Sequence, residues 1–281
     1  MKSNLPDDLW ESDDVPPDIR RELLRCRPRL GVIGQRLHWL TTTGSTNDVA
    51  FRLVELGAPE GATVVAEEQT AGRGRHGRVW FSPSGAGLYV SVILTPSNER
   101  SLPTGENPAA LLTLAIGVAI AEGVRAATGL PTEIKWPNDV MIGKRKLAGI
   151  LAESTARAAA GAVVVVGIGV NLQPAAYPPE LATRATSIEA ETNRPADRAV
   201  ILAEILACVA ERYAQLRAGK FDAILSAWRR LAPSLPSAPI EWDSPRGVIR
   251  GRAEGIDESG ALLVRVGDQV ERVIAGEVRW I

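Results

Sequence analysis

The chain has 281 residues, enough to bury a full hydrophobic core and to form one large domain with a smaller one beside it. Its 32 Lys and Arg nearly balance its 33 Asp and Glu, which excludes a protein whose whole surface is built to bind nucleic acid. Cys26 and Cys208 belong to no CxxC or Cys/His cluster, which argues against a disulfide scaffold and a structural zinc site and fits a reducing, cytoplasmic compartment.

The first 35 residues show no sustained hydrophobic periodicity, apart from a possible short helix over residues 19–26. This segment is acidic and contains prolines, and it does not have the basic start and apolar core of a signal peptide. We therefore expect a loosely ordered N-terminal extension over residues 1–35. The longest apolar run, residues 108–129, contains Glu122 and Arg125, so it predicts a buried helix and no membrane span.

Strand and helix signals alternate over residues 36–232. Ser45 or Thr46 can cap a helix that ends at Gly57. Strands over residues 62–67 and 87–95 flank a loop rich in glycine and arginine. The remaining predicted elements are a helix over 107–129 that Asn107 caps, a strand over 133–136, a hairpin of 140–142 with 146–153, a strand over 162–172, and helices over 197–217, capped by Asp197, and 221–231.

Prolines 233, 236 and 239 interrupt the chain after the last of these helices. Residues 248–263 then alternate between strand and turn signals, a pattern typical of a small antiparallel barrel. We therefore place a domain boundary near residue 233 and predict an α+β fold followed by a small β-barrel.

The most informative segment is the run EQTAGRGRHGRVW at residues 68–80. Its glycines permit close backbone approach, and the guanidinium groups of Arg73, Arg75 and Arg78 can each hold two oxygens of a phosphate or carboxylate. Alone, such a run is equally compatible with a solvated loop or an RNA-binding segment. It is accompanied, in order along the chain, by GSTN at 44–47, KWPNDV at 135–140, RKLAGIL at 145–151 and GIGVN at 167–171.

These five motifs, from about residue 40 to about residue 280, resemble the biotin-protein ligases, whose signature reads GSTN, EQxxGRGRxGRxW, KWPND, KLAGIL and GIGxN. The resemblance implies a class II synthetase-like biotin/lipoate ligase catalytic domain over residues 36–232 and an SH3-like domain over 233–281. Many family members also carry an N-terminal winged helix-turn-helix of roughly 60 residues, against the ~35 available here. We therefore expect the monofunctional type, with no specific DNA partner.

The resemblance implies an enzyme that activates biotin with ATP as biotinyl-5'-AMP, with Mg²⁺ as activator. It then transfers biotin to a lysine of the biotin carboxyl carrier domain of a biotin-dependent carboxylase such as acetyl-CoA carboxylase. The first step brings two anions together, so the site needs positive charge. A monomer and a homodimer are both compatible with the sequence, which identifies neither the metal ligands nor the particular carrier. No membrane partner is expected.

Four residues are expected to be catalytic: Lys146, Arg73, Arg75 and Asp139. The family lysine that Lys146 matches contacts both the biotin carboxyl and the α-phosphate. The two arginines are expected to bind the phosphates and the carboxylate. Asp139 either binds magnesium indirectly or helps to deprotonate the incoming lysine, and its alternative is an ordinary turn aspartate.

The residues expected to bind the nucleotide are Arg73, Arg75, Arg78, Lys135, Asn138 and Asn171. The amide of Asn138 suits hydrogen bonding to adenine. Lys135 can instead extend along a strand surface with its head in water, and Asn171 can be a strand-end turn residue. No GxxxxGK[ST] loop occurs, so ATP is not held as in P-loop proteins, and no GxSxG motif indicates an acyl-enzyme.

Biotin needs directional hydrogen bonds to its ureido ring and apolar cover for the remainder. The predicted substrate-binding residues are Ser45, Thr46, Asn47, Gln69, Gly72, Arg73, Gly74, Arg75, Trp80, Lys146, Gly149 and Gly169. The glycines let the backbone approach the ligand, and Trp80 either stacks over the ligand or packs in the core.

Two alternatives stay open. A lipoate ligase or octanoyltransferase shares the catalytic fold but is not expected to combine GRGRxGR with KWPND. An RNA-binding module that uses the arginine loop would show a steep dependence of its affinity on salt.

Overall fold

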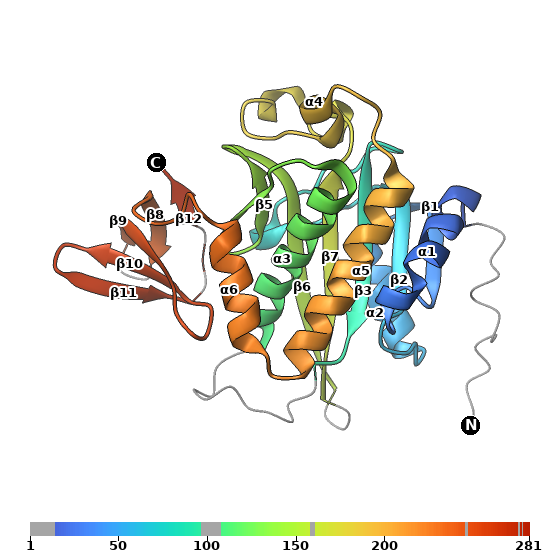
Figure 1. Cartoon of the computed structure of the whole chain (residues 1–281), viewed down its shortest axis with the longest axis horizontal. Helices are drawn as coiled ribbons and strands as arrows, with labels where there is room; N and C mark the ends of the chain where they lie inside the picture. The colour runs from blue at the N-terminus through green and yellow to red at the C-terminus, as the bar shows by residue number, and fades with distance from the viewer. Residues whose placement is uncertain (1–14, 97–107, 158–160, 245–246, 275, 277) are drawn as a thin grey trace.

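The computed structural model describes residues 15–96, 108–157, 161–244, 247–274, 276 and 278–281. Its larger part is built on a seven-stranded sheet in the order β1-β2-β3-β7-β6-β5-β4 (Figure 1). Within this sheet β1 and β2 pair in parallel and the other neighbours are antiparallel. The strands are β1 (Leu37–Thr43), β2 (Thr63–Gln69), β3 (Gly87–Leu94), β4 (Glu133–Lys135), β5 (Asp139–Ile142), β6 (Arg145–Arg157) and β7 (Gly161–Asn171).

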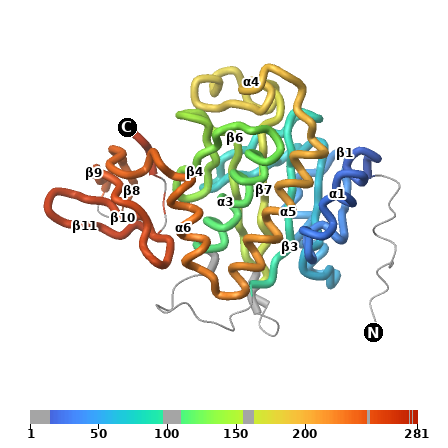
Figure 2. The backbone as a smooth tube through the Cα atoms, in the orientation of Figure 1, coloured from blue at the N-terminus to red at the C-terminus, as the bar shows by residue number. Residues whose placement is uncertain are grey.

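Helices cover both faces of this sheet. On one face lie α3 (Pro108–Thr128) and α5 (Arg198–Arg217), with α1 (Pro17–Leu30) packed on α5 and α6 (Phe221–Leu231) beside α3 (Figures 1 and 2). On the opposite face, α2 (Thr46–Glu55) packs its Ala50 and Val54 against Val64 and Val165. The short α4 (Ile188–Thr192) follows the segment after β7.

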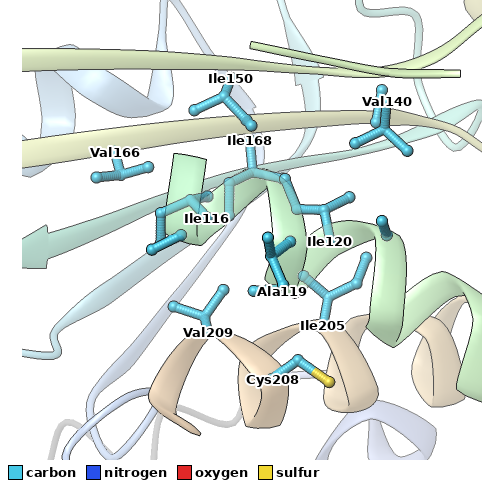
Figure 3. Close-up of a cluster of buried hydrophobic side chains, with 14 of the residues drawn as sticks. Ile116, Ala119, Ile120, Val140, Ile150, Val166, Ile168, Ile205, Cys208 and Val209 are labelled. Carbon is cyan, nitrogen blue, oxygen red and sulfur yellow. The ribbon is translucent and has the colours of Figure 1, made fainter. Parts of the chain in front are cut away.

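Helix α3 forms the centre of the main core. Its Ile116, Ala119 and Ile120 are fully buried and lie between side chains of the sheet, such as Ile150, and side chains of α5, such as Val209 (Figure 3). By length and hydropathy alone, the stretch Ala110–Thr128 could cross a membrane, but 67% of it is buried inside the protein. An apolar helix that is mostly buried inside the protein is a core helix, as the sequence predicted.

Strand β7 explains how a pocket forms on the α2 face. Successive strand residues point to opposite faces, and Val164 and Val166 contribute to the core around α3, whereas Val163 and Val165 pack beneath α2. Further along this second face the residues are Gly167 and Gly169. Because glycines replace the valines there, the sheet has no side chains at these two positions and leaves space above it.

The C-terminal part is a five-stranded antiparallel sheet in the order β11-β10-β9-β8-β12. Its strands are β8 (Pro239–Ser244), β9 (Gly247–Ile256), β10 (Leu262–Val266), β11 (Gln269–Val273) and β12 (Val278–Trp280). Trp136 Nε1 donates to the carbonyl of Gly260 at 3.0 Å, which joins this sheet to the larger part. The small antiparallel unit predicted from the sequence is confirmed, while the exact boundary at residue 233 stays a prediction.

Two expectations need correction. Residues 17–30 form a full helix and are not loosely ordered, because Ile19, Leu23 and Leu30 are buried and Arg29 pairs with Glu204 and Glu211 of α5, each at 2.7 Å.

Ser45 stands at the start of α2 but makes no capping hydrogen bond with its side chain. The predicted cap by Asp197 is confirmed, since its Oδ1 accepts from the backbone N–H of Val200 at 3.1 Å. Residues 1–14 and Asn107 lie outside the described residues.

Candidate active site

One pocket on the α2 face of the sheet collects most of the residues that the sequence predicted. It is bordered by the start of α2, the arginine loop after β2, Asn138 in the turn before β5, and strands β3, β6 and β7. Its lining consists of Ser45, Thr46, Asn47, Gln69, Arg73, Gly74, Arg75, Trp80, Val90, Asn138, Lys146, Gly149, Ile150, Leu151, Gly167, Ile168 and Gly169. Gly72, Arg78, Lys135, Asp139 and Asn171 were predicted for the site but are not part of this lining.

The buried end of the pocket is polar and closely hydrogen bonded. Gln69 Oε1 accepts from the backbone N–H of Thr46 at 2.9 Å and lies 3.1 Å from Thr46 Oγ1. Its Nε2 donates to Ser82 Oγ at 3.0 Å, and the Ser82 hydroxyl donates to the carbonyl of Trp80 at 2.9 Å. Gln69 therefore ties the first turn of α2 to the far end of the arginine loop and replaces the side-chain cap that Ser45 does not provide.

Two residues of this polar end were missed by the sequence analysis. Ser91 is fully buried, and its hydroxyl lies 2.7 Å from Thr46 Oγ1 and 2.6 Å from Asn47 Oδ1. Glu153 Oε2 accepts from Asn47 Nδ2 at 2.6 Å. The available signal for Ser91 was a lone polar residue inside β3, whose residues are otherwise apolar and buried throughout.

The close packing of Asn47 also explains a glycine. A Cβ atom at Gly167 would lie 2.6 Å from Asn47 Oδ1, a separation that side chains do not tolerate. Glycine at this position therefore lets the amide lie directly on the sheet.

The arginine loop is held at two points. Arg73 donates from Nη1 and Nη2 to the two carboxylate oxygens of Asp48 at 2.7 Å each, and its Nη2 lies 3.3 Å from Glu153 Oε2. This guanidinium lowers the pKa of Asp48, because the hydrogen bonds favour the carboxylate. Arg75 Nη1 donates to Asn138 Oδ1 at 3.1 Å. Arg78 is exposed, on the outside of the loop.

The ammonium of Lys146 lies over the ring of Trp80 in the pocket. Lys146 Nζ lies 2.6 Å from Asp139 Oδ1 and 5.2 Å from the centroid of the Trp80 ring. The indole rests on Gly149 and Gly169, which are paired neighbours on β6 and β7. A Cβ at Gly149 would lie 2.9 Å from the ring, and one at Gly169 would overlap it. Glycine is therefore required at both positions, because the ring of Trp80 occupies the space that a side chain would need.

The Trp80 side chain fills space that a ligand would need. Its Nε1 is buried and has no hydrogen-bond partner among the residues that the structure describes. The cavity beside it measures about 50 Å³, whereas ligand pockets measure roughly 300–1,000 Å³. Binding of a biotin-sized or larger molecule here therefore requires the indole or the arginine loop to move.

Two of the predicted residues outside the lining, Gly72 and Asn171, stabilise the backbone around the site. The carbonyl of Gly72 accepts from the N–H of Trp80 at 2.9 Å. Asn171 Nδ2 donates to the carbonyl of Thr186 at 2.9 Å, and the N–H of Thr186 donates to the carbonyl of Lys146 at 2.9 Å. In this state the amide group of Asn171 thus holds the segment that fixes the backbone of Lys146.

Lys135 points toward the C-terminal sheet. Its Nζ lies 5.6 Å from the centroid of the Trp280 ring in β12, and Lys135 is not part of the pocket lining.

Comparison with known proteins agrees with this arrangement. Residues 39–171 match the biotin/lipoate A/B protein ligase family, and residues 243–279 match the biotin protein ligase C-terminal domain. The bifunctional ligase/repressor BirA of Bacillus subtilis (strain 168) is 35% identical over 265 residues, which cover 94% of this chain and 79% of BirA. The biotin--[acetyl-CoA-carboxylase] ligase of Mycobacterium tuberculosis is 34% identical over 280 residues, covering 96% of this chain and 98% of that protein.

Among solved structures, the biotin protein ligase from Aquifex aeolicus in complex with biotin and ATP superposes with a TM-score of 0.76 and 28% identity. The superposition covers 88% of this chain and 100% of that one. The matches extend over both sheets, and the pocket brings together residues from all five motifs or their immediate supports. The chain therefore belongs to the biotin protein ligases, within the biotin/lipoate A/B protein ligase family.

Proposed function

We propose that this protein activates biotin with ATP and transfers the biotinyl group to a lysine of a biotin carboxyl carrier domain. The observation that carries this proposal is the pocket itself. It combines a hydrogen-bonded polar end at Asn47 and Gln69, a glycine floor, and two cations, Arg75 and Lys146, at its other side. Such a site suits a ligand with a neutral polar ring at one end and a reacting anion at the other.

In the first step, an oxygen of the biotin carboxylate attacks the α-phosphorus of ATP. A carboxyl-to-phosphorus bond forms, the bond to the β-phosphate oxygen breaks, and pyrophosphate leaves. Lys146 and Arg75 reduce the repulsion between the two anions and stabilise charge as it develops. Asp139, 2.6 Å from Lys146 Nζ, orients this ammonium before the substrates arrive.

In the second step, the neutral amine of the carrier lysine attacks the carbonyl carbon of biotinyl-AMP. An amide forms, the bond from this carbon to the phosphate oxygen breaks, and AMP leaves. The attacking amine must lose a proton, and we assign Asp139 as the carboxylate that accepts it. This role and the orientation of Lys146 are compatible, because a carboxylate has several acceptor sites.

Magnesium enters this scheme together with ATP. Within the described ranges, no group of three or more His, Cys, Asp or Glu side chains could hold a metal ion. This fits an ion that is carried mainly by substrate phosphates and touches only one or two protein carboxylates. Asp139 is the predicted carboxylate.

The two free cysteines, Cys26 and Cys208, support a cytoplasmic location.

The test is calorimetry followed by a substrate-dependence assay. Biotin should bind alone, and ATP should bind more tightly when biotin is present. Pyrophosphate should be released only when both are added, and mass spectrometry should find biotin on a carrier domain. ATP turnover that proceeds equally well without biotin, or that prefers octanoate or lipoate, would contradict the proposal.

A further inference from the structure

Glu153 on β6 connects the polar end of the pocket with the arginine loop. The same oxygen, Oε2, accepts from Asn47 Nδ2 at 2.6 Å and lies 3.3 Å from Arg73 Nη2. Arg73 also holds Asp48 through two hydrogen bonds of 2.7 Å. Because Asn47 and Asp48 are consecutive residues in the first turn of α2, these contacts join this helix start, the loop and β6 into one network.

Glu153 also determines the orientation of the side-chain amide of Asn47. The hydroxyl of Ser91, 2.6 Å from Asn47 Oδ1, could donate to an amide oxygen or accept from an amide nitrogen. A carboxylate can only accept, so Glu153 requires Nδ2 on its own side and Oδ1 toward Ser91. Asn47 is 2% exposed, so water does not compete for these groups.

The orientation has a consequence for the ligand. An amide nitrogen carries two N–H groups, and one of them is used by Glu153. Among the described residues the second N–H of Asn47 has no partner, and Asn47 lines the pocket. This second N–H is therefore available to donate a hydrogen bond to a carbonyl oxygen of the ligand, such as that of a ureido ring.

We infer that Glu153 is a positioning residue for the reaction: it fixes the Asn47 amide for biotin and, through Arg73, couples that amide to closure of the arginine loop. This inference rests on the proposed function. It also assigns Arg73 mainly to holding the loop, because its charge already faces Asp48 and Glu153. The reacting phosphate is then left to Arg75 and Lys146.

The decisive variant is Glu153→Gln, which keeps the side-chain size. Glutamine accommodates Asn47 in either orientation and does not offer Arg73 a charge. Calorimetry without ATP should show biotin binding about tenfold more weakly, as expected when a hydrogen bond to a charged group is lost. The KM for biotin should rise in parallel, while the KM for ATP stays within about twofold. Amide hydrogen exchange in residues 72–78 should become faster.

Asp48→Asn separates the effect on biotin binding from the effect on hydrogen exchange in the arginine loop. It leaves Glu153 on Asn47 but removes one carboxylate from Arg73, so exchange in the loop should become faster while the Kd for biotin stays within about twofold of wild type. The matched control is Glu254→Gln, which removes a carboxylate from Arg265 on the C-terminal sheet and should change neither quantity.

Three results would overturn the inference. Glu153→Gln could bind biotin as the wild type does, Asp48→Asn could weaken biotin binding as much as Glu153→Gln, or Glu153→Gln could raise both KM values equally with a lower Tm. The last outcome would show a merely structural role. If the wild-type protein itself does not bind biotin, the proposed function fails, and this failure is distinct from all three.

Discussion

Replacing Lys146 with methionine removes one positive charge from the pocket while keeping an unbranched side chain of similar length. Lys146 is 32% exposed and its partner Asp139 is 24% exposed. Because water can solvate Asp139 once the lysine is gone, the pair should contribute at most about 1 kcal/mol to the free energy of unfolding. A loss of this size lowers Tm by roughly 2–4 °C in a protein of 150–250 residues, and somewhat less in a longer chain.

The effect on catalysis should be much larger. Loss of a charge that faces the reacting oxygens typically costs ~2.7–4 kcal/mol of transition-state stabilisation, or ~100-fold to 1,000-fold in rate. The assay is biotin-dependent release of pyrophosphate, measured together with thermal unfolding. The structure offers a close control in Lys144→Met, since Lys144 is an exposed lysine on the turn of the same hairpin. Near wild-type release by Lys146→Met, or an equal loss in Lys144→Met, would refute the role given to Lys146.

Three further outcomes are expected. Residues 72–78 should exchange amide hydrogens more slowly once biotinyl-AMP is bound than in the free protein, because an anion would organise Arg75; equal protection in both states would contradict this. Burial raises the pKa of Cys208 to about 11, so its thiol should stay neutral at pH 8 and resist iodoacetamide until the protein is unfolded; rapid alkylation of the folded protein would contradict its burial. The 281-residue chain should not retain operator DNA in gel shifts at physiological salt, because the apolar face of α1 is already buried on α5; tight, sequence-selective retention that depends on biotinyl-AMP would overturn this.

The order of elements could be predicted well from local sequence. The apolar composition of α3 indicated a buried helix, and the hairpin around Gly143 was placed by its turn and by the apolar residues on either side. The length and order of helix α1 were underestimated, because its arginines make it strongly polar. Its order depends on α5, which lies more than 160 residues away along the chain and supplies Glu204 and Glu211. No local pattern contains that information.

The sequence alone determined the family, since five motifs in a fixed order are specific, and it identified most of the residues that line the pocket. Only the tertiary structure decided which partner each charged side chain of the pocket contacts. Arg73 and Arg75 are equivalent in the motif, yet one faces Asp48 and Glu153 and the other faces Asn138. The physical reason is that the partners of the two arginines come from α2, from β6 and from the turn before β5. Those neighbours are set by how the sheet and α2 pack together.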